Sequence, residues 1–406
     1  MAIPTLADES RAQHGFYVPQ FEIRIEGVGL PRDVLRDVSQ VTYRDNLKEI
    51  DGFELIVNNW DPRTRQFKYV GFETAADLTG SDDRAQRARL FDPCNKEVEL
   101  RAGYLGDLRT LMRGTFTSLE PTFPSGGAPT LAVRALNALH KLRRKQISHT
   151  WESLRDSQIA EKIGEDRQRF PMPIVVSDEA REKELPLPYI AQTQQYDIDF
   201  LLLRAKRLGY VVVIREGDAK ATDPRRRTTH LYFGPSDGRR PGATDPLYRL
   251  RWGASLVEFK PTLTTANQIK SVTVNGWDRK KKEVITGKAS LDDEALAINK
   301  DLHHLLKECD PREEIVVEQP VYSKDEADRR AIAILKDRHK EMVKASAACV
   351  GLPSLMAGTK VEIEGVGARF SGVYFITATT HSFGDSGYTT RFDARREVTG
   401  SLEGLQ

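Results

Sequence analysis

The sequence predicts a mainly β protein with an α+β insert: two similar antiparallel β-barrel modules in one chain, with a small α/β lobe between them. Three observations support this fold class. Apolar and charged residues alternate over many short segments, a β-hairpin pattern occurs twice in the same order, and a helix-rich stretch separates the two copies. We place the modules at residues 15–145 and 245–396, and the lobe at residues 150–240.

The repeated hairpin pattern recurs about 260 residues further along the chain. The first copy lies within Glu97–Val133 and contains Gly114, and the second lies within Lys360–Phe392 and contains Gly372. A duplicated module gives one subunit two near-equivalent faces, so a ring of such subunits has twice as many equivalent positions as chains.

A shorter match precedes each hairpin copy. Trp60 and Asp61 follow Val57-Asn58-Asn59, and Trp277 and Asp278 follow Val274-Asn275-Gly276. The second copy has roughly 43 more residues between this landmark and its hairpin. If the modules are duplicated, Trp60 should superpose on Trp277 and Gly114 on Gly372. The alternative is that alternating strands resemble one another by chance.

The first module is built from short strands. Phe21–Glu26 alternates apolar and charged residues, and Gly27–Gly29 forms a turn after it. Phe53–Val57 and Phe67–Phe72 are expected as further strands, because the Asp-Pro pair between them favours a turn. A polar stretch, Asp77–Arg89, then precedes the hairpin copy.

The lobe has a different pattern. Trp151–Gly164 is expected as a short helix, and Asp197 is expected to cap a clearer amphipathic helix that ends at Gly209. Tyr210–Ile214 then reads as a buried strand, with Leu231–Phe233 as its hairpin partner.

The second module resumes the alternation from Tyr248, through Leu256–Phe259, Ser271–Val274 and Ile315–Val317. Ser323–Glu326 forms a capping box that opens a long helix, so a helical insertion is predicted at about residues 323–344. This helix explains part of the extra length in the second copy.

Composition limits the functional class. Lys and Arg total 61 and Asp and Glu total 59, so a net charge of +2 creates no global field for a polyanion. No apolar run approaches the roughly 20 residues of a membrane span, and the N-terminus lacks the features of a secretory signal. We expect synthesis in the bacterial cytoplasm without a signal peptide. Cys94, Cys309 and Cys349 are too scattered for a zinc site and read as reduced structural cysteines.

The sequence offers no catalytic, cofactor-binding or metal-binding constellation. Gly365-Val366-Gly367 has the wrong spacing for a dinucleotide loop, and His303-His304 has no carboxylates at ligand spacing. Basic clusters occur at Arg143–Lys145 and Arg279–Lys282, and in a set made of Arg225, Arg226, Arg227, Arg239 and Arg240. The usual role of such clusters is a solvated surface, and the functional alternative is contact with an acidic partner or with DNA. The last set is the candidate for partner contact, on an exposed edge loop of the lobe.

These residues resemble a known family. The lobe closely resembles the phage late control gene D protein family, through Trp151–Ile163, then Gln195–Ala205 running into Leu208–Tyr210, and Leu231–Phe233 after them. Gly358–Arg395, including His381, looks like that family's closing segment. The resemblance covers most of residues 18–396. That family is the hub of contractile tails and is similar to the N-terminal hub half of the valine-glycine repeat spike proteins of type VI secretion.

The resemblance implies a homotrimer whose two barrels per chain alternate around a pseudo-hexameric ring. Such a ring adapts the six-fold inner tube above it to the three-fold spike below it, among other baseplate proteins, with DNA or effector cargo passing through and no membrane contact. The fused spike proteins carry further domains after the hub, whereas this chain ends about ten residues after its last predicted strand, so a separate spike protein is expected. The host particle is a phage tail, a tailocin or an extracellular injection system.

Two other classes of function stay open at this stage. A tail-associated enzyme, such as a peptidoglycan hydrolase, needs a catalytic carboxylate or a Cys/His pair in a cleft, and zymography detects it. A nucleic-acid-binding module would use the Arg clusters and show strongly salt-dependent affinity for DNA in filter binding.

Overall fold

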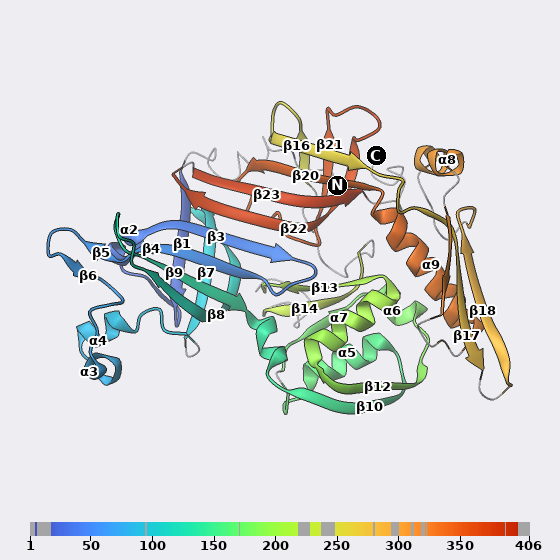
Figure 1. The fold of residues 1–406 in the computed structure, drawn as a ribbon, viewed down its shortest axis with the longest axis horizontal. Coiled ribbons are helices and arrows are strands. Elements are labelled where there is room, and N and C mark those ends of the chain that lie inside the picture. The colour runs from blue at the N-terminus through green and yellow to red at the C-terminus, as the bar shows by residue number, and fades with distance from the viewer. Residues whose placement is uncertain are drawn as a thin grey trace.

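One large β-sheet dominates the computed structural model, with a helical lobe beneath it and a smaller sheet backed by a helix at one end (Figure 1). The structure describes residues 5, 18–93, 96–169, 171–217, 228–236, 248–278, 281–293, 300–309, 312–317, 321, 323–385 and 387–396. The expected mainly β class is confirmed.

The first module contributes seven strands to the large sheet. They alternate buried and solvent-facing residues, as β4 does with Phe53, Leu55 and Val57 facing the core. The strands are β1 (Pro19–Ile25), β2 (Val28–Gly29), β3 (Val38–Asn46), β4 (Gly52–Asn58), β7 (Glu97–Tyr104), β8 (Asp107–Thr122) and β9 (Thr130–Asn137). Smaller elements between them are α2 (Arg32–Asp37), β5 (Trp60–Asp61), β6 (Gln66–Phe67), α3 (Ala75–Thr79) and α4 (Asp83–Ala88). The expected strand Phe67–Phe72 is therefore wrong beyond its first residue.

The second module supplies the other six strands. They are β15 (Tyr248–Arg251), β16 (Leu256–Leu263), β20 (Val343–Val350), β21 (Lys360–Glu364), β22 (Gly372–Gly384) and β23 (Gly387–Arg396). Each module has its own hydrophobic core, but Phe383 and Tyr388 of the second module pack in the core of the first.

The expectation of two separate antiparallel barrels is corrected by the strand pairing. All these strands lie in one 13-stranded sheet whose main path is β16-β20-β23-β22-β3-β4-β9-β8-β7-β1-β2, and no closed barrel occurs among the described residues. The reason is that the edge of β3 that would close a first barrel is bonded to β22 of the other module. One pair, β15 with β21, is parallel.

The two modules nevertheless share a strand order. The path β7-β8-β9-β4-β3 in the first module matches β21-β22-β23-β20-β16 in the second, with antiparallel pairing throughout. Irregularities recur at matching places. The pairing with β9 skips Thr117 and that with β23 skips Thr377, and the outer strands β3 and β16 skip Ser39 and Val257. This correspondence supports the duplication more strongly than the sequence landmarks do.

Those landmarks do not mark equivalent positions. Trp60 lies in β5, shortly after β4, whereas Trp277 lies in β17 (Ile269–Asp278), a strand of a separate three-stranded sheet. Gly114 and Gly372 do lie on corresponding strands, β8 and β22, but the shared bulge aligns Gly114 with Tyr374. The Trp-Asp prediction is therefore wrong, and the Gly pair is two residues out of register.

The lobe follows the first module and has its own core. Its elements are η2 (Ala138–Arg143), β10 (Gln146–Leu154), α5 (Asp156–Glu165), β11 (Ile174–Val176), α6 (Asp178–Lys183), β12 (Leu187–Tyr196), α7 (Asp197–Leu208), β13 (Tyr210–Arg215) and β14 (His230–Pro235). The helix that ends at Gly209, in the left-handed conformation at φ 70°, and the pairing of β13 with β14 are confirmed. Trp151 was expected in a helix but lies in strand β10, since the helix begins only at Asp156.

The second module carries an insertion between β16 and β20, where the first has only a short loop, residues 47–51, between β3 and β4. It contains β17 (Ile269–Asp278), β18 (Glu283–Ser290), α8 (Lys300–Glu308), β19 (Arg312–Val316) and α9 (Lys324–Lys340). The long helix opened by Ser323 is confirmed, with Ser323 accepting a hydrogen bond from the Glu326 amide. Ser271–Val274 and Ile315–Val317 were expected in the barrel. Ser271–Val274 lies instead in β17 and Ile315–Val316 in β19, two strands of the separate sheet that α9 covers (Figure 1).

Candidate functional site: the polar sheet face and the module junction

A continuous polar face runs across both modules on the side of the sheet away from the cores. One row of directly opposed residues crosses seven strands from β20 to β8. Its members are Val350, Thr389, Ser382, Thr42, Glu54, Arg134 and Ser118. Arg134 contacts Glu54 at 2.5 Å and Glu120 at 3.6 Å, so the arginine is paired within the face. Apart from Val350, this row consists of hydroxyl-bearing and charged side chains, and its one arginine is paired with glutamates.

Strands β22 and β3 join the modules into this single surface (Figure 1). Their pairing runs from Ala378 opposite Asn46 to Phe383 opposite Val41. Aromatic rings pack behind the joint, with Phe21 and Phe383 centroids 5.6 Å apart. The joint therefore combines main-chain pairing with a buried aromatic contact.

His381 lies at the centre of this joint and is fully buried. Its Nε2 lies 3.0 Å from the Leu355 carbonyl oxygen, which can only accept, so Nε2 carries the proton. Its Nδ1 then accepts from the Tyr388 hydroxyl at 2.8 Å. Burial lowers the pKa of His381 to about 4, so the ring is neutral at pH 7.

A cluster of buried polar groups marks the point where both modules and the lobe meet. Asp45 at the end of β3 accepts a 2.6 Å hydrogen bond from the Ala357 amide of the second module, and Arg215 of the lobe donates to the Ala357 carbonyl. Asp51 accepts from the Asn46 amide at 2.9 Å and from the Asn137 side chain at 2.7 Å. The three parts of the chain are thus bonded together through a few side chains.

The two carboxyl groups of this cluster share a hydrogen bond, and ionising both of them in this buried position is energetically unfavourable. Burial raises the pKa of Asp45, although the nearby Arg215 opposes the shift. Burial, and secondarily the charge of Asp45, raise the pKa of Asp51 well above its ordinary value. At pH values between 3.8 and the raised pKa values, the folded pair therefore holds a proton that the unfolded chain would release.

The free energy of unfolding of the wild type should fall as the pH rises. We expect this fall to be smaller in the Asp45→Asn variant. Because both folded pKa values lie above the ordinary 3.8, stability is fully present below that pH and declines as the pH rises through the raised values. An asparagine keeps the acceptor for Ala357 and can donate to Asp51. Urea unfolding at pH 4.5 and pH 8 should show the variant gaining stability over wild type at the higher pH. An equal difference at both pH values would contradict the shared proton.

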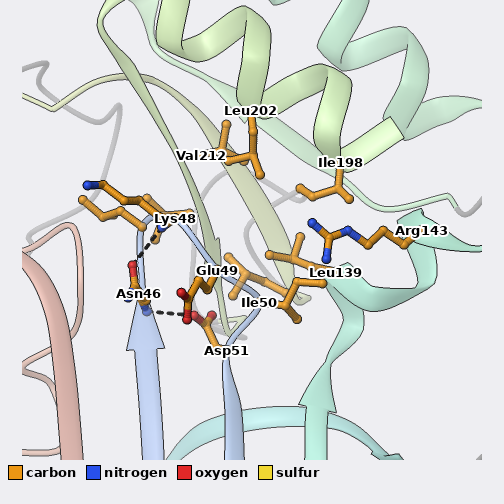
Figure 2. Close-up of a pocket in the computed structure, with 13 residues that line it drawn as sticks. Asn46, Lys48, Glu49, Ile50, Asp51, Leu139, Arg143, Ile198, Leu202 and Val212 are labelled. Carbon is orange, nitrogen blue, oxygen red and sulfur yellow. Dashed lines mark hydrogen bonds between the residues drawn. The ribbon is translucent and has the colours of Figure 1, made fainter. Parts of the chain in front are cut away.

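The hairpin between β3 and β4 inserts its tip into the lobe (Figure 2). Ile50 packs on the lobe core, and the space left between the tip and the lobe is about 20 Å³, room for one water molecule. A second link joins the lobe to β8, where Glu216 accepts from the Arg113 amide at 3.0 Å and from Thr229 at 2.8 Å. These contacts hold the lobe against the sheet but leave no ligand-sized cavity there.

The residues singled out from the sequence are not gathered at this site. Asp61 and Asp278 each accept a hydrogen bond from the amide two or three residues later, so both serve in local turns. The Arg225–Arg227 set and Arg239–Arg240 lie outside the described residues, as do Cys94, Arg279 and Lys280. In the described part of the chain, no group of three His, Cys, Asp or Glu residues is placed to hold a metal ion. No helix described there has the length and apolarity needed to cross a membrane.

Sequence reasoning missed Asp45 and Asp51. A usable signal existed for Asp45, since Val41, Tyr43 and Asp45 alternate on the buried side of β3. A carboxylate at an inward position of a strand needs a partner, and that need indicates a structural or functional role.

A family model described as "Alg8 N-terminal domain" matches residues 76–385, more than half of the chain. That description makes no statement about tails or secretion. No curated protein matches the chain.

Solved structures share the fold at low sequence identity. A 43 kDa tail protein of prophage MuSo2 from Shewanella oneidensis is 12% identical with a TM-score of 0.62, over 93% of this chain and 98% of that one. A tail protein from Neisseria meningitidis is 12% identical with a TM-score of 0.62, over 94% and 97%. An Escherichia coli component of the type VI secretion system, described as similar to the T4 tail proteins gp27 and gp5, is 13% identical with a TM-score of 0.51, over 93% and 78%.

These matches confirm the likeness to tail hub proteins that the sequence resemblance predicted. At such identities they establish the fold alone. The chain belongs to the family described as the Alg8 N-terminal domain, and it shares its fold with the phage tail proteins and the type VI secretion component named above.

Proposed function

We propose that this chain is the structural hub of a contractile injection machine. Three copies form a ring in which first and second modules alternate, and the ring adapts a six-fold inner tube to a three-fold spike. The observation that carries the proposal is the shared strand order of the two modules within one continuous sheet. Three chains with two such modules each present six similar positions.

The polar face of the sheet is suited to line the lumen of that ring. Along the row described, hydroxyl groups accompany an arginine that is paired with glutamates, a surface past which DNA or protein cargo can move without being held by an apolar patch. The inner tube protein, a spike protein and other baseplate proteins are the proposed partners. Two of the similar solved structures are tail proteins, which supports a structural role over an enzymatic one.

We expect the purified chain to associate weakly alone and to form a stable trimer when its spike protein is present. Permanent assemblies of this kind usually bury about 2,000 Å² or more per interface, and the net charge of +2 adds little repulsion. Mass photometry with and without that spike protein measures this. A monodisperse dimer that ignores both spike and tube proteins would sink the proposal, because two-fold closure cannot present six positions to a tube.

A further inference from the structure

We propose that neighbouring chains join edge to edge, β8 of one chain beside β16 of the next, in the register that β22 and β3 have within a chain. The inference rests on the proposed trimer and adds which surfaces meet and in which alignment. The partner of each surface is therefore a second copy of this chain.

The argument starts from the strand equivalence. In the matched orders, β8 corresponds to β22 and β16 corresponds to β3. Within the chain, the modules are joined by the far half of β22 pairing with β3. The corresponding edges, the far half of β8 and the outer side of β16, have no strand partner among the described residues. The free edges of β8 and β16 therefore correspond to the two strands, β22 and β3, that pair at the joint within the chain.

The shared bulges set the register. Skipped residues Thr117 and Thr377 align β8 with β22, and skipped residues Ser39 and Val257 align β3 with β16. Transferring the β22–β3 pairing gives six opposed pairs between chains. They are Ser118 with Thr264, Leu119 with Leu263, Glu120 with Thr262, Pro121 with Pro261, Thr122 with Lys260, and Phe123 with Phe259.

The side chains suit this alignment. Leu119 meets Leu263 and Phe123 meets Phe259 on the core side of the sheet, and Phe123 is 54% exposed in the free chain. On the polar side Glu120 lies diagonally from Lys260, within reach of an ion pair. Apolar residues thus meet apolar ones, and the charges are complementary.

The two prolines define how strong the joint is. Pro121 and Pro261 have no N–H, so main-chain bonding at the centre of the joint is interrupted. Proline on an edge strand also discourages indiscriminate strand addition. The joint between chains is therefore weaker than the β22–β3 joint, which fits assembly from separate chains.

Disulfide trapping tests the register. In a background of Cys94→Ser and Cys309→Ser, the double variant Glu120→Cys/Thr262→Cys places one cysteine on each edge. Directly opposed residues lie within disulfide reach, whereas diagonal ones lie about 7–8 Å apart. Because the contact is head to tail, mild oxidation should close a covalent trimer, about fivefold faster than in the control Glu120→Cys/Lys260→Cys. Both altered sites are on the surface, so folding is preserved and is checked by circular dichroism.

A charge exchange supplies the second arm. Lys260→Glu opposes Glu120 and should weaken the trimer about tenfold, and Glu120→Lys/Lys260→Glu should restore it. Light scattering shows whether the trimer forms. If it forms but neither cysteine pair closes, or if the control pair closes equally fast, the edge pairing is wrong and the proposed hub function is unaffected. Absence of any trimer, with or without the spike protein, removes the proposed function itself.

Discussion

Asp156→Ala is expected to lower the free energy of unfolding of the lobe by about 3–5 kcal/mol. Asp156 begins helix α5 and forms two hydrogen bonds with the Arg204 guanidinium of α7, one of them 2.9 Å long. Both side chains are almost fully buried, at 5% and 7% exposure. The alanine would leave an uncompensated charge inside the lobe. Urea unfolding by circular dichroism measures the loss, and hydrogen exchange assigns it to residues 146–235.

The exposed pair of Arg143 and Asp199 provides the matched control. Its side chains are 51% and 40% exposed at a distance of 2.7 Å, so Asp199→Ala should cost less than about 1 kcal/mol. Asp156→Leu combined with Arg204→Met removes both buried charges and should recover most of the stability. If Asp156→Ala cost no more than Asp199→Ala, the buried pair would not hold the lobe together.

Gly114→Ala is expected to destabilise the first module by about 3 kcal/mol or to prevent its folding. At Gly114, strand β8 pairs with β7 on one side and begins to pair with β9 on the other. An added Cβ would lie 2.0 Å from the Leu136 carbonyl oxygen and 2.7 Å from its carbon. Those are backbone atoms of a central strand and cannot move aside. The yield of folded protein and the midpoint of thermal unfolding measure the effect.

Gly384→Ala is the control, at the tip of the corresponding strand β22. A Cβ there meets nothing within 4 Å, so the change should be neutral or slightly stabilising. A soluble Gly114→Ala protein with the wild-type midpoint would show that β8 and β9 do not approach as closely as described.

Local chemistry predicted the elements that depend on neighbours in the sequence. Ser323 and Gly209 bound their helices because capping needs only a few adjacent residues. The same locality produced the error at the Trp-Asp landmarks. Trp60 and Trp277 each sit opposite another apolar residue in a hairpin, and the following Asp starts the turn. The same kind of local turn requires similar short sequences, so the Trp-Asp pattern occurs in two unrelated parts of the fold.

The joint between the modules depends on contacts that no local pattern encodes. Strands β3 and β22 are far apart in the chain, and their register is set by pairing between the two modules. Asp45 and Ala357 meet only because of that register. The similarity of the two modules was visible in the hairpins, whereas the fusion of both modules into one sheet was not.

Electron microscopy of the assembled ring with its spike protein tests the central claim most directly. We expect a three-fold particle whose wall contains six similar module positions, with Thr42 and Ser382 of the polar face lining the lumen. The β22–β3 joint within chains and the joint between chains should alternate around the wall. A ring in which the two modules occupy unlike positions, or in which the polar face points outward, would contradict the claim.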